Sequence, residues 1–207
     1  MTYTVAPHLD YFKVPFADFQ AARPEFNDFG VGGYIFSRAD PTPRALLLQR
    51  ALTDSMPGCW ECPGGASELE HDQTLLDSVV REILEESGLH VSRIVDLVAV
   101  DCWPSRHRKG ATIIKYSFLV EVHECYHESA GNWQHVPTLQ IPVKLDTLEH
   151  QQFEWATEED VQSSEQSANG PYKLPHGRFG HQGRNIIRAF EMIKGRQSKV
   201  SAGNPVQ

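Results

Sequence analysis

Hydrophobic residues between positions 74 and 88 recur at the spacing of a helix with one apolar face. Aliphatic side chains stand every three or four residues, at Leu75, Leu76, Val79, Val80, Ile83 and Leu84. Thr74 is followed three residues later by Asp77, which resembles a capping box, and Gly88 suits the residue after a helix end. The pattern therefore predicts a helix over Thr74–Gly88 with both of its ends defined.

Most of the other apolar stretches are short and bounded by turn residues, which is typical of strands. Strands are expected at Phe29–Phe36, Ala45–Arg50, Cys59–Pro63, Val91–Trp103, Ala111–Val122 and Phe153–Trp155. Ala156–Val161 reads as a short helix start, and Asn185–Lys194 as an amphipathic closing helix. The stretch Asn132–Leu145 has little pattern, so no element is predicted there.

The length of 207 residues suits one domain with extensions. Residues 1–27 are broken by prolines but contain aromatic residues that include Tyr11, Phe12, Phe16 and Phe19, which predicts an N-terminal extension that packs on the domain. The domain itself is expected over 28–195. Residues 196–207 are small and polar, and are predicted to form a flexible C-terminal tail.

Composition and charge narrow the classes of partner. The formal net charge of −8 argues against binding a nucleic acid polymer, which favours a basic surface. No apolar run approaches the ~20 residues that cross a bilayer, and the N-terminus lacks the features of a signal peptide, so no membrane partner is expected. Four cysteines make no disulfide framework. We therefore expect a reducing, cytoplasmic location.

Three carboxylates crowd the end of the predicted helix. Glu82, Glu85 and Glu86 stand at i, i+3 and i+4, which places them on one side of a helix. A solvated acidic face is the common explanation of such a run. Here the acids lie near the negative end of the helix dipole, where they are unfavourable. A divalent cation such as Mg²⁺ or Mn²⁺ would offset the repulsion, and Arg81 is placed to orient one carboxylate.

The segment Pro63–Leu89 resembles the Nudix box, G-x5-E-x7-R-E-U-x-E-E-x-G-U, where U is aliphatic. Arg81–Leu89 fits its second half at every fixed position. Counting back from Arg81, Ser67 and Gln73 stand where the box has its glycine and first glutamate. A two-residue insertion follows the glycine pair Gly64–Gly65. The resemblance to the Nudix hydrolase superfamily implies an α/β (α+β) fold, a Nudix-type α/β/α sandwich with a mixed β-sheet.

The resemblance also implies the metal ligands. Glu82, Glu85 and Glu86 would hold Mg²⁺ or Mn²⁺, with Arg81 as their electrostatic partner. A further acid often comes from a late loop as ligand or general base. Glu149 is the candidate here, with Glu154 and Glu121 as rivals and His150 as an alternative base. Gln73 in place of an acid predicts weaker metal binding, and Gln73→Glu would then strengthen it.

Substrate contacts are expected from residues ahead of the box and from one basic loop. Gly64 and Gly65 would let backbone approach a phosphate. Arg50 ends a strand at a place that often faces substrate in this family, although a plain surface salt bridge is the alternative. Arg106 belongs to a basic turn that either clamps phosphates or is simply solvated.

The implied activity is divalent-metal-dependent hydrolysis of a diphosphate linkage in a nucleoside diphosphate-X or related organic pyrophosphate. Catalysis would rest on Glu85, Glu86, Glu149 and Arg81. Two alternatives stay open: a Nudix fold acting on a non-nucleotide such as an isoprenoid diphosphate, and a non-catalytic binding or regulatory module. The partner is expected to be a small-molecule diphosphate, and the oligomeric state, monomer or homodimer, is left open.

Overall fold

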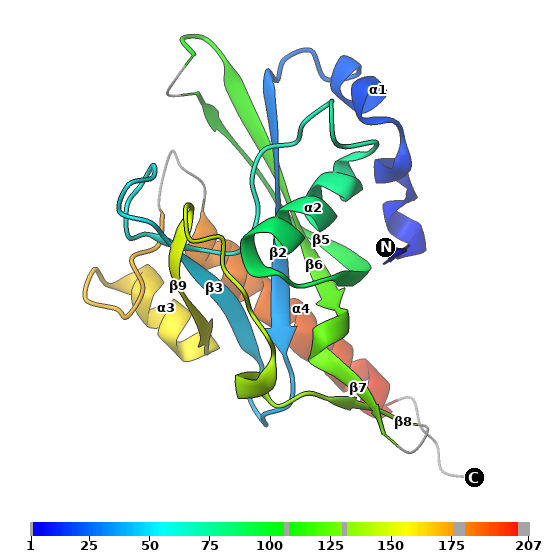
Figure 1. Cartoon of the computed structure of the whole chain (residues 1–207), viewed down its shortest axis with the longest axis vertical. Coiled ribbons are helices and arrows are strands. Elements are labelled where there is room, and N and C mark those ends of the chain that lie inside the picture. Colours follow the sequence, from blue (N-terminus) through cyan, green and yellow to red (C-terminus); the bar gives the residue numbers. More distant parts are fainter. Residues whose placement is uncertain (1, 106–107, 130–131, 176–180, 203–207) are drawn as a thin grey trace.

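A mixed β-sheet forms the centre of the molecule in the computed structural model, which describes residues 2–105, 108–129, 132–175 and 181–202 (Figure 1). Seven strands make this sheet in the order β1-β5-β6-β2-β3-β4, with β9 paired to β3. Their bounds are β1 Thr4–Val5, β2 Asp28–Ser37, β3 Arg44–Arg50, β4 Trp60–Glu61, β5 Val91–Pro104, β6 Thr112–Val122 and β9 His150–Ala156. β2 runs parallel to β6, and β6 antiparallel to β5.

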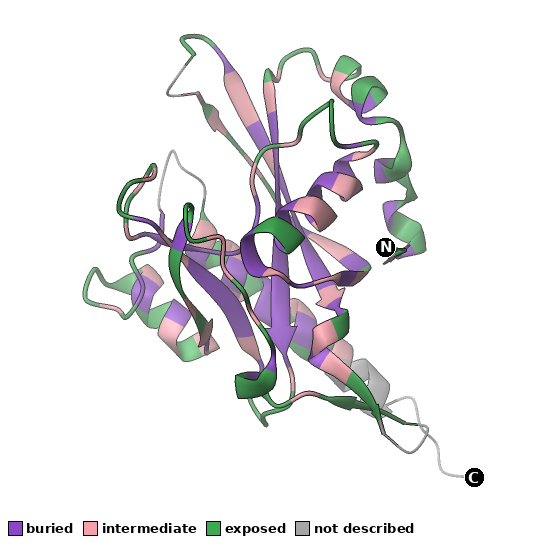
Figure 2. Ribbon diagram, viewed as in Figure 1, coloured by how far each residue is buried: buried purple, intermediate pink, exposed green. Residues whose placement is uncertain are grey.

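The sheet is covered by helices on both sides, which explains why every residue of β2 after Asp28 is buried. The helices are α1 Phe16–Ala21, α2 Leu75–Ser87, α3 Glu158–Gln166 and α4 Gln182–Ala202. Val31 and Ile35 of β2 pack in one core with α2, whereas Tyr34 and Phe36 pack in a second core with α4. Figure 2 shows the buried strands between these layers. The expected α/β sandwich with a mixed sheet is confirmed.

The predicted ends of α2 are confirmed in detail. The Thr74 hydroxyl accepts from the backbone N–H of Asp77, and the Asp77 carboxylate accepts from the backbone N–H of Thr74. Gly88 ends the helix in the left-handed conformation with φ 68°. These caps fix where the last turn of α2 falls, and therefore which way its glutamates project.

The N-terminal segment packs against the sheet and α2. β1 pairs with β5, and the 3-10 helix η1 (Pro7–Lys13) and α1 follow it. Phe12, Phe16 and Phe19 are buried in the core that contains α2. The Phe16 N–H donates to the Gln73 carbonyl, so this segment also holds the loop that precedes α2. Packing by residues 2–27 thus agrees with the sequence, while the domain boundaries stay a prediction.

Two regions differ from the sequence predictions. α4 runs from Gln182 to Ala202, longer than the helix expected over Asn185–Lys194, and it enters the segment predicted as a flexible tail. The patternless stretch contains β8 (Asn132–His135), which pairs with β7 (Tyr126–Ser129) after the 3-10 helix η2 (His123–Cys125). A third 3-10 helix, η3, spans Thr138–Gln140. β8 is exposed along its length, so no apolar alternation marks it.

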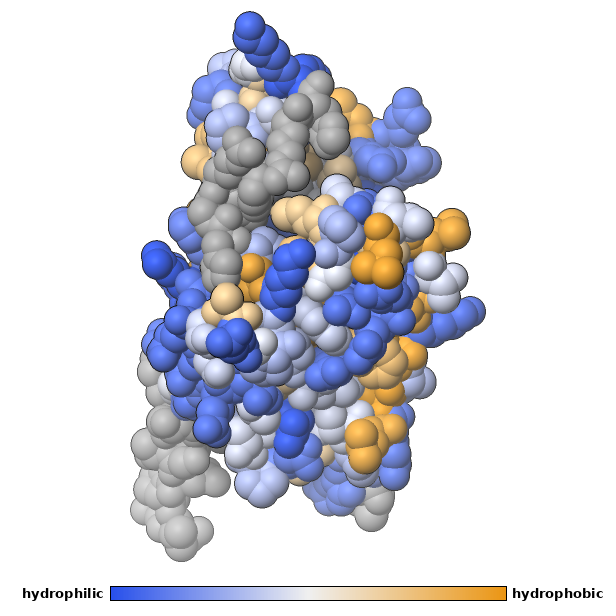
Figure 3. Space-filling model, turned by 90° about the vertical axis from the view of Figure 1, so that its left-hand side faces the viewer, coloured by the Kyte–Doolittle hydropathy of each residue, from blue (hydrophilic) through white to orange (hydrophobic). Residues whose placement is uncertain are grey.

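The outer surface is mostly hydrophilic on the face shown in Figure 3, where apolar side chains gather in separate groups along one edge. Among the described residues, no helix combines the length and apolarity that a membrane span requires.

Candidate active site

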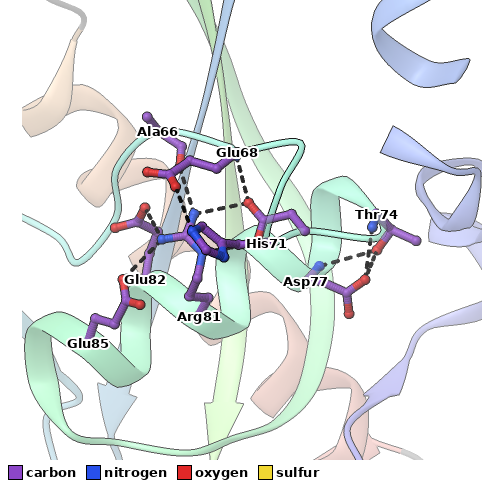
Figure 4. Close-up of polar contacts among 9 residues, drawn as sticks. Ala66, Glu68, His71, Thr74, Asp77, Arg81, Glu82 and Glu85 are labelled. Carbon is purple, nitrogen blue, oxygen red and sulfur yellow. Dashed lines mark hydrogen bonds and ion pairs between the residues drawn. The ribbon is translucent and has the colours of Figure 1, made fainter. Parts of the chain in front are cut away.

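Arg81 is the hub of the polar contacts on α2 (Figure 4). Its Nε and Nη2 donate to the two carboxylate oxygens of Asp72, each at 3.0 Å. Its Nη1 donates to Glu82 at 2.8 Å and to Glu85 at 3.0 Å, and Nη2 also reaches the Ala66 carbonyl at 2.8 Å. The hydrogen bonds to Asp72 raise the pKa of Arg81. One guanidinium therefore ties the loop before α2 to two glutamates of the helix.

Asp72, and not residue 73, is the acid that contacts Arg81 in the loop before α2. Its side chain is 1% exposed, and it also accepts from the Glu68 N–H at 2.8 Å. Burial alone would raise the pKa of Asp72, but the hydrogen bonds from Arg81 and Glu68 outweigh burial and lower it. Gln73 is exposed. The structure thus places a buried acid, Asp72, on Arg81, while the expected weaker metal binding stays a prediction.

We predict that Gln73→Glu leaves the affinity for Mn²⁺ unchanged within about 2-fold, because a solvent-screened carboxylate adds little attraction. Asp72→Asn should weaken Mn²⁺ binding by about 10–100-fold, since Arg81 then loses the partner that orients it. Titration calorimetry with Mn²⁺ on both variants measures this. If Gln73→Glu instead binds Mn²⁺ more tightly, residue 73 lies close to the proposed metal site and the prediction is wrong.

Glu82 and Glu86 point into the protein, whereas Glu85 is exposed. Burial raises the pKa of Glu82 to about 6. Burial, aided by the nearby Glu61 carboxylate, raises the pKa of Glu86 to about 9, although Glu86 accepts a 2.6 Å hydrogen bond from the Gly64 N–H. A second carboxylate so close to a buried one is unfavourable without a cation. Glu82 and Glu86 are therefore suited to bind a divalent ion.

The glycine pair is needed for contact with these acids. A Cβ on Gly65 would lie 2.5 Å from Glu82 Oε2, so a side chain at this position would displace that carboxylate. Gly64 has a φ of 148°, and a Cβ there would lie 2.2 Å from the Val31 carbonyl oxygen. The glycines thus bring backbone to the acidic cluster.

Glu149 lies beside Glu86 of α2, although it follows that residue by more than 60 positions in the sequence. One ligand atom each from Glu86, Glu149 and His150 lie within 4.8 Å of one another. Glu149 is exposed, whereas its rival Glu154 accepts hydrogen bonds from Tyr172 and Gln152. Oxygen-rich clusters of this kind suit Mg²⁺ or Mn²⁺.

Arg50 and His150 meet at Glu61, a buried acid that the sequence analysis missed. Arg50 forms ion pairs with Glu61 and Asp54, and His150 Nε2 lies 3.4 Å from Glu61 Oε1. Burial opposes ionisation of Glu61, but the contacts to His150 and Arg50 lower its pKa overall. The sequence does contain an indication of this buried acid, because Glu61 is a charged residue between Trp60 and Cys62 in a stretch otherwise suited to the core. These ion pairs are largely buried and not the surface salt bridge considered as the alternative, and the substrate contact of Arg50 stays a prediction.

A cavity of about 260 Å³ adjoins the acidic cluster. Gly64, Gly65, Glu61 and Arg50 form the wall shared with the cluster. The remaining walls come from β2, β5, β6, the loop containing Met56 and the start of α4, with side chains that include Asp101, Trp103, Ile113, Lys115 and Gln182. Arg106, the proposed phosphate clamp, lies outside the described residues.

Residues 28–176 match the family model of the NUDIX domain, and the chain belongs to this family. It is 39% identical over 70 residues to an 8-oxo-dGTP diphosphatase of Proteus vulgaris, across 33% of this chain and 60% of that protein. It is 44% identical over 97 residues to the m7GpppN-mRNA hydrolase NUDT17 of Homo sapiens, across 45% of this chain and 28% of that protein. The matches thus cover less than two thirds of either relative.

Solved structures share the fold. An Ap4A hydrolase of C. elegans, crystallised as a binary complex, superposes with a TM-score of 0.53 at 18% identity. The match covers 82% of this chain and 97% of that one. At this identity the likeness concerns the fold alone.

Proposed function

We propose that this protein hydrolyses the diphosphate linkage of a nucleoside diphosphate-X or related organic pyrophosphate, using Mg²⁺ or Mn²⁺. The observation that carries the proposal is the cluster of Glu82, Glu85 and Glu86, braced by Arg81 and adjoined by Glu149, beside a cavity. Membership of the NUDIX family supports it.

Each residue has a role that follows from its position. Glu82, Glu86 and Glu149 provide the hard oxygen ligands, and the Gly64 N–H fixes the orientation of Glu86. Arg81 holds Glu82 and Glu85 in place. A divalent cation bound there would neutralise phosphate oxygens and acidify a bound water. Glu149, exposed and next to Glu86, is placed to take the proton of that water.

The printed names of the relatives support a nucleotide substrate. They include 8-oxo-dGTP diphosphatase, m7GpppN-mRNA hydrolase and, from Methanocaldococcus jannaschii, ADP-ribose pyrophosphatase. All three names imply a substrate with a phosphoanhydride. The departures from the box at Ser67 and Gln73 argue slightly for a non-catalytic module. Asp72, which contacts Arg81, supports catalysis in spite of the glutamine at position 73. Gly64 and Gly65 provide the close backbone approach that the box glycine would give.

We predict phosphate or nucleotide release from part of a panel of nucleoside triphosphates, sugar nucleotides, dinucleotides, capped dinucleotides and prenyl diphosphates. Excess EDTA should abolish turnover, and Mg²⁺ or Mn²⁺ added above the chelator should restore it. EDTA already saturated with Mg²⁺ is the control. Undiminished turnover in free EDTA contradicts the metal mechanism, and turnover of prenyl diphosphates alone contradicts the nucleotide substrate.

A further inference from the structure

Two neighbouring strands, β5 and β6, place polar and aromatic residues along the cavity. Asp101 of β5 lies opposite Lys115 of β6, and Trp103 lies opposite Ile113. Side chains two residues apart in a strand point to the same face, and all four residues line the cavity. The cavity therefore has an acceptor and an aromatic ring on one strand and a cation on the next.

Asp101 is fixed but retains acceptor capacity. Asn185, near the start of α4, donates to its Oδ2 at 2.5 Å. Its Oδ1 receives no hydrogen bond from the residues that the structure describes. An ionised carboxylate has about four acceptor positions and no donor. A ligand that contacts Asp101 must therefore present N–H or O–H groups.

Lys115 lies at the end of the cavity nearest the acids. Glycine at position 32 makes room for it, since a Cβ there would lie 3.0 Å from Lys115 Cε. Its ammonium has no hydrogen bond or ion pair within the described part of the chain, Asp101 included. Its positive charge acts to lower the pKa of Glu61 and Glu86. A phosphate held between Lys115 and the cluster would orient its nucleoside towards Trp103.

We infer that this cavity binds a guanine-type base, with Asp101 as hydrogen-bond acceptor and Trp103 as stacking surface. The inference rests on the proposed function, because it places the nucleoside of the substrate. Guanine presents two adjacent N–H donors, N1–H and the 2-amino group, which match two carboxylate oxygens. Adenine and cytosine place a ring nitrogen acceptor beside their amino group, and that acceptor would face the carboxylate unfavourably. The cavity is smaller than the about 300–1,000 Å³ of drug-sized sites, which suits a single base.

The test is equilibrium binding of GMP, AMP and CMP in EDTA, where hydrolysis does not intervene. We expect GMP to bind at least about 10-fold more tightly than AMP or CMP, the discrimination typical of paired hydrogen bonds. Asp101→Asn replaces one acceptor with a donor and should remove most of the preference for GMP over AMP. Trp103→Leu should weaken all three nucleotides by about 10-fold through lost stacking.

Asp28→Asn is the matched control, because Asp28 also lines the cavity but pairs with Arg108. Losing a negative charge should strengthen binding of every nucleotide without changing the ratio of GMP to AMP. Equal affinities for the three nucleotides, or an unchanged ratio in Asp101→Asn, would overturn the inference. Because the assay needs no turnover, a failure of hydrolysis is seen separately from a failure of base recognition.

Discussion

Glu86→Gln is expected to lower hydrolysis by roughly 10²–10⁴-fold while making the metal-free protein more stable. The loss of activity follows from removing one charged ligand of the proposed metal site beside Glu149. The gain in stability follows from burial, because an ionised Glu86 is unfavourable next to Glu61. The glutamine carbonyl can still accept the hydrogen bond from Gly64 that the carboxylate accepts.

The stability effect depends on pH in a defined direction. The pKa of Glu86 is raised from 4.5 to about 9 in the folded protein, so the folded state binds more protons than the unfolded state between these values. The free energy of unfolding therefore falls as pH rises through this window. Glu86→Gln removes that loss, and we expect about 1–3 kcal/mol of added stability at neutral pH and almost none below pH 4.5.

Thermal unfolding in EDTA across pH, together with activity in Mg²⁺, measures both effects. Glu159→Gln, at an exposed position of α3, is the control for loss of one charge and should change neither quantity appreciably. If melting temperature and activity both fall in Glu86→Gln, the carboxylate is a structural group and the metal centre lies elsewhere.

Gly64→Ala is expected to destabilise the protein by about 3 kcal/mol or more. Its φ of 148° is rarely adopted by residues with a side chain, and the new methyl would overlap the backbone of Val31. Backbone of β2 cannot move without disturbing the hydrogen bonds that the Val31 and Gly33 N–H groups donate to Gly65 and Pro63. Activity should fall as well, because the Gly64 N–H would leave Glu86.

Gly110→Ala is the control that separates the cost of a positive φ from the cost of steric overlap with the new methyl group. Gly110 also has a positive φ, 80°, but no atom of the described residues lies within 4 Å of the position that its Cβ would take. We expect a cost of only about 1 kcal/mol and unchanged metal binding. Urea unfolding of both variants gives the comparison. Similar losses at the two positions would show that the close approach at Gly64 is relaxed at little cost.

Local patterns explain what the sequence predicted well. The spacing of apolar residues and the caps at Thr74 and Gly88 define α2, and α2 in turn defines which way Arg81 and Glu86 project. Six strands of the sheet were predicted because they are apolar and bounded by turns, whereas the two-residue strand β1 was not predicted. β8 was missed because it is exposed, and the full length of α4 because its last turns lack strong apolar periodicity.

Contacts between distant segments explain what was missed. The role of Asp72 depends on how the inserted loop folds over Arg81, which counting along the box does not reveal. Glu61 becomes a partner of Arg50 and His150 only when β3, β4 and β9 pair. Asp101 and Lys115 lie opposite each other in the cavity wall only because of the register between β5 and β6. Such relations require the sheet topology, which residue spacing alone does not give.

The order of strands in the sheet has a consequence for the growing chain on the ribosome. β2 pairs with β3 only at Phe36 and Ser37, so most of its length stays unpaired until β6 is made. β3 cannot cover its second edge until β9 is made, as the pair Leu47 with Glu154 shows. At about 5–20 residues per second, the apolar strand β3 waits roughly 5–20 s for β9 during translation. At the same rate, Glu149 follows Glu86 by roughly 3–13 s, so the complete acidic cluster forms only late in synthesis.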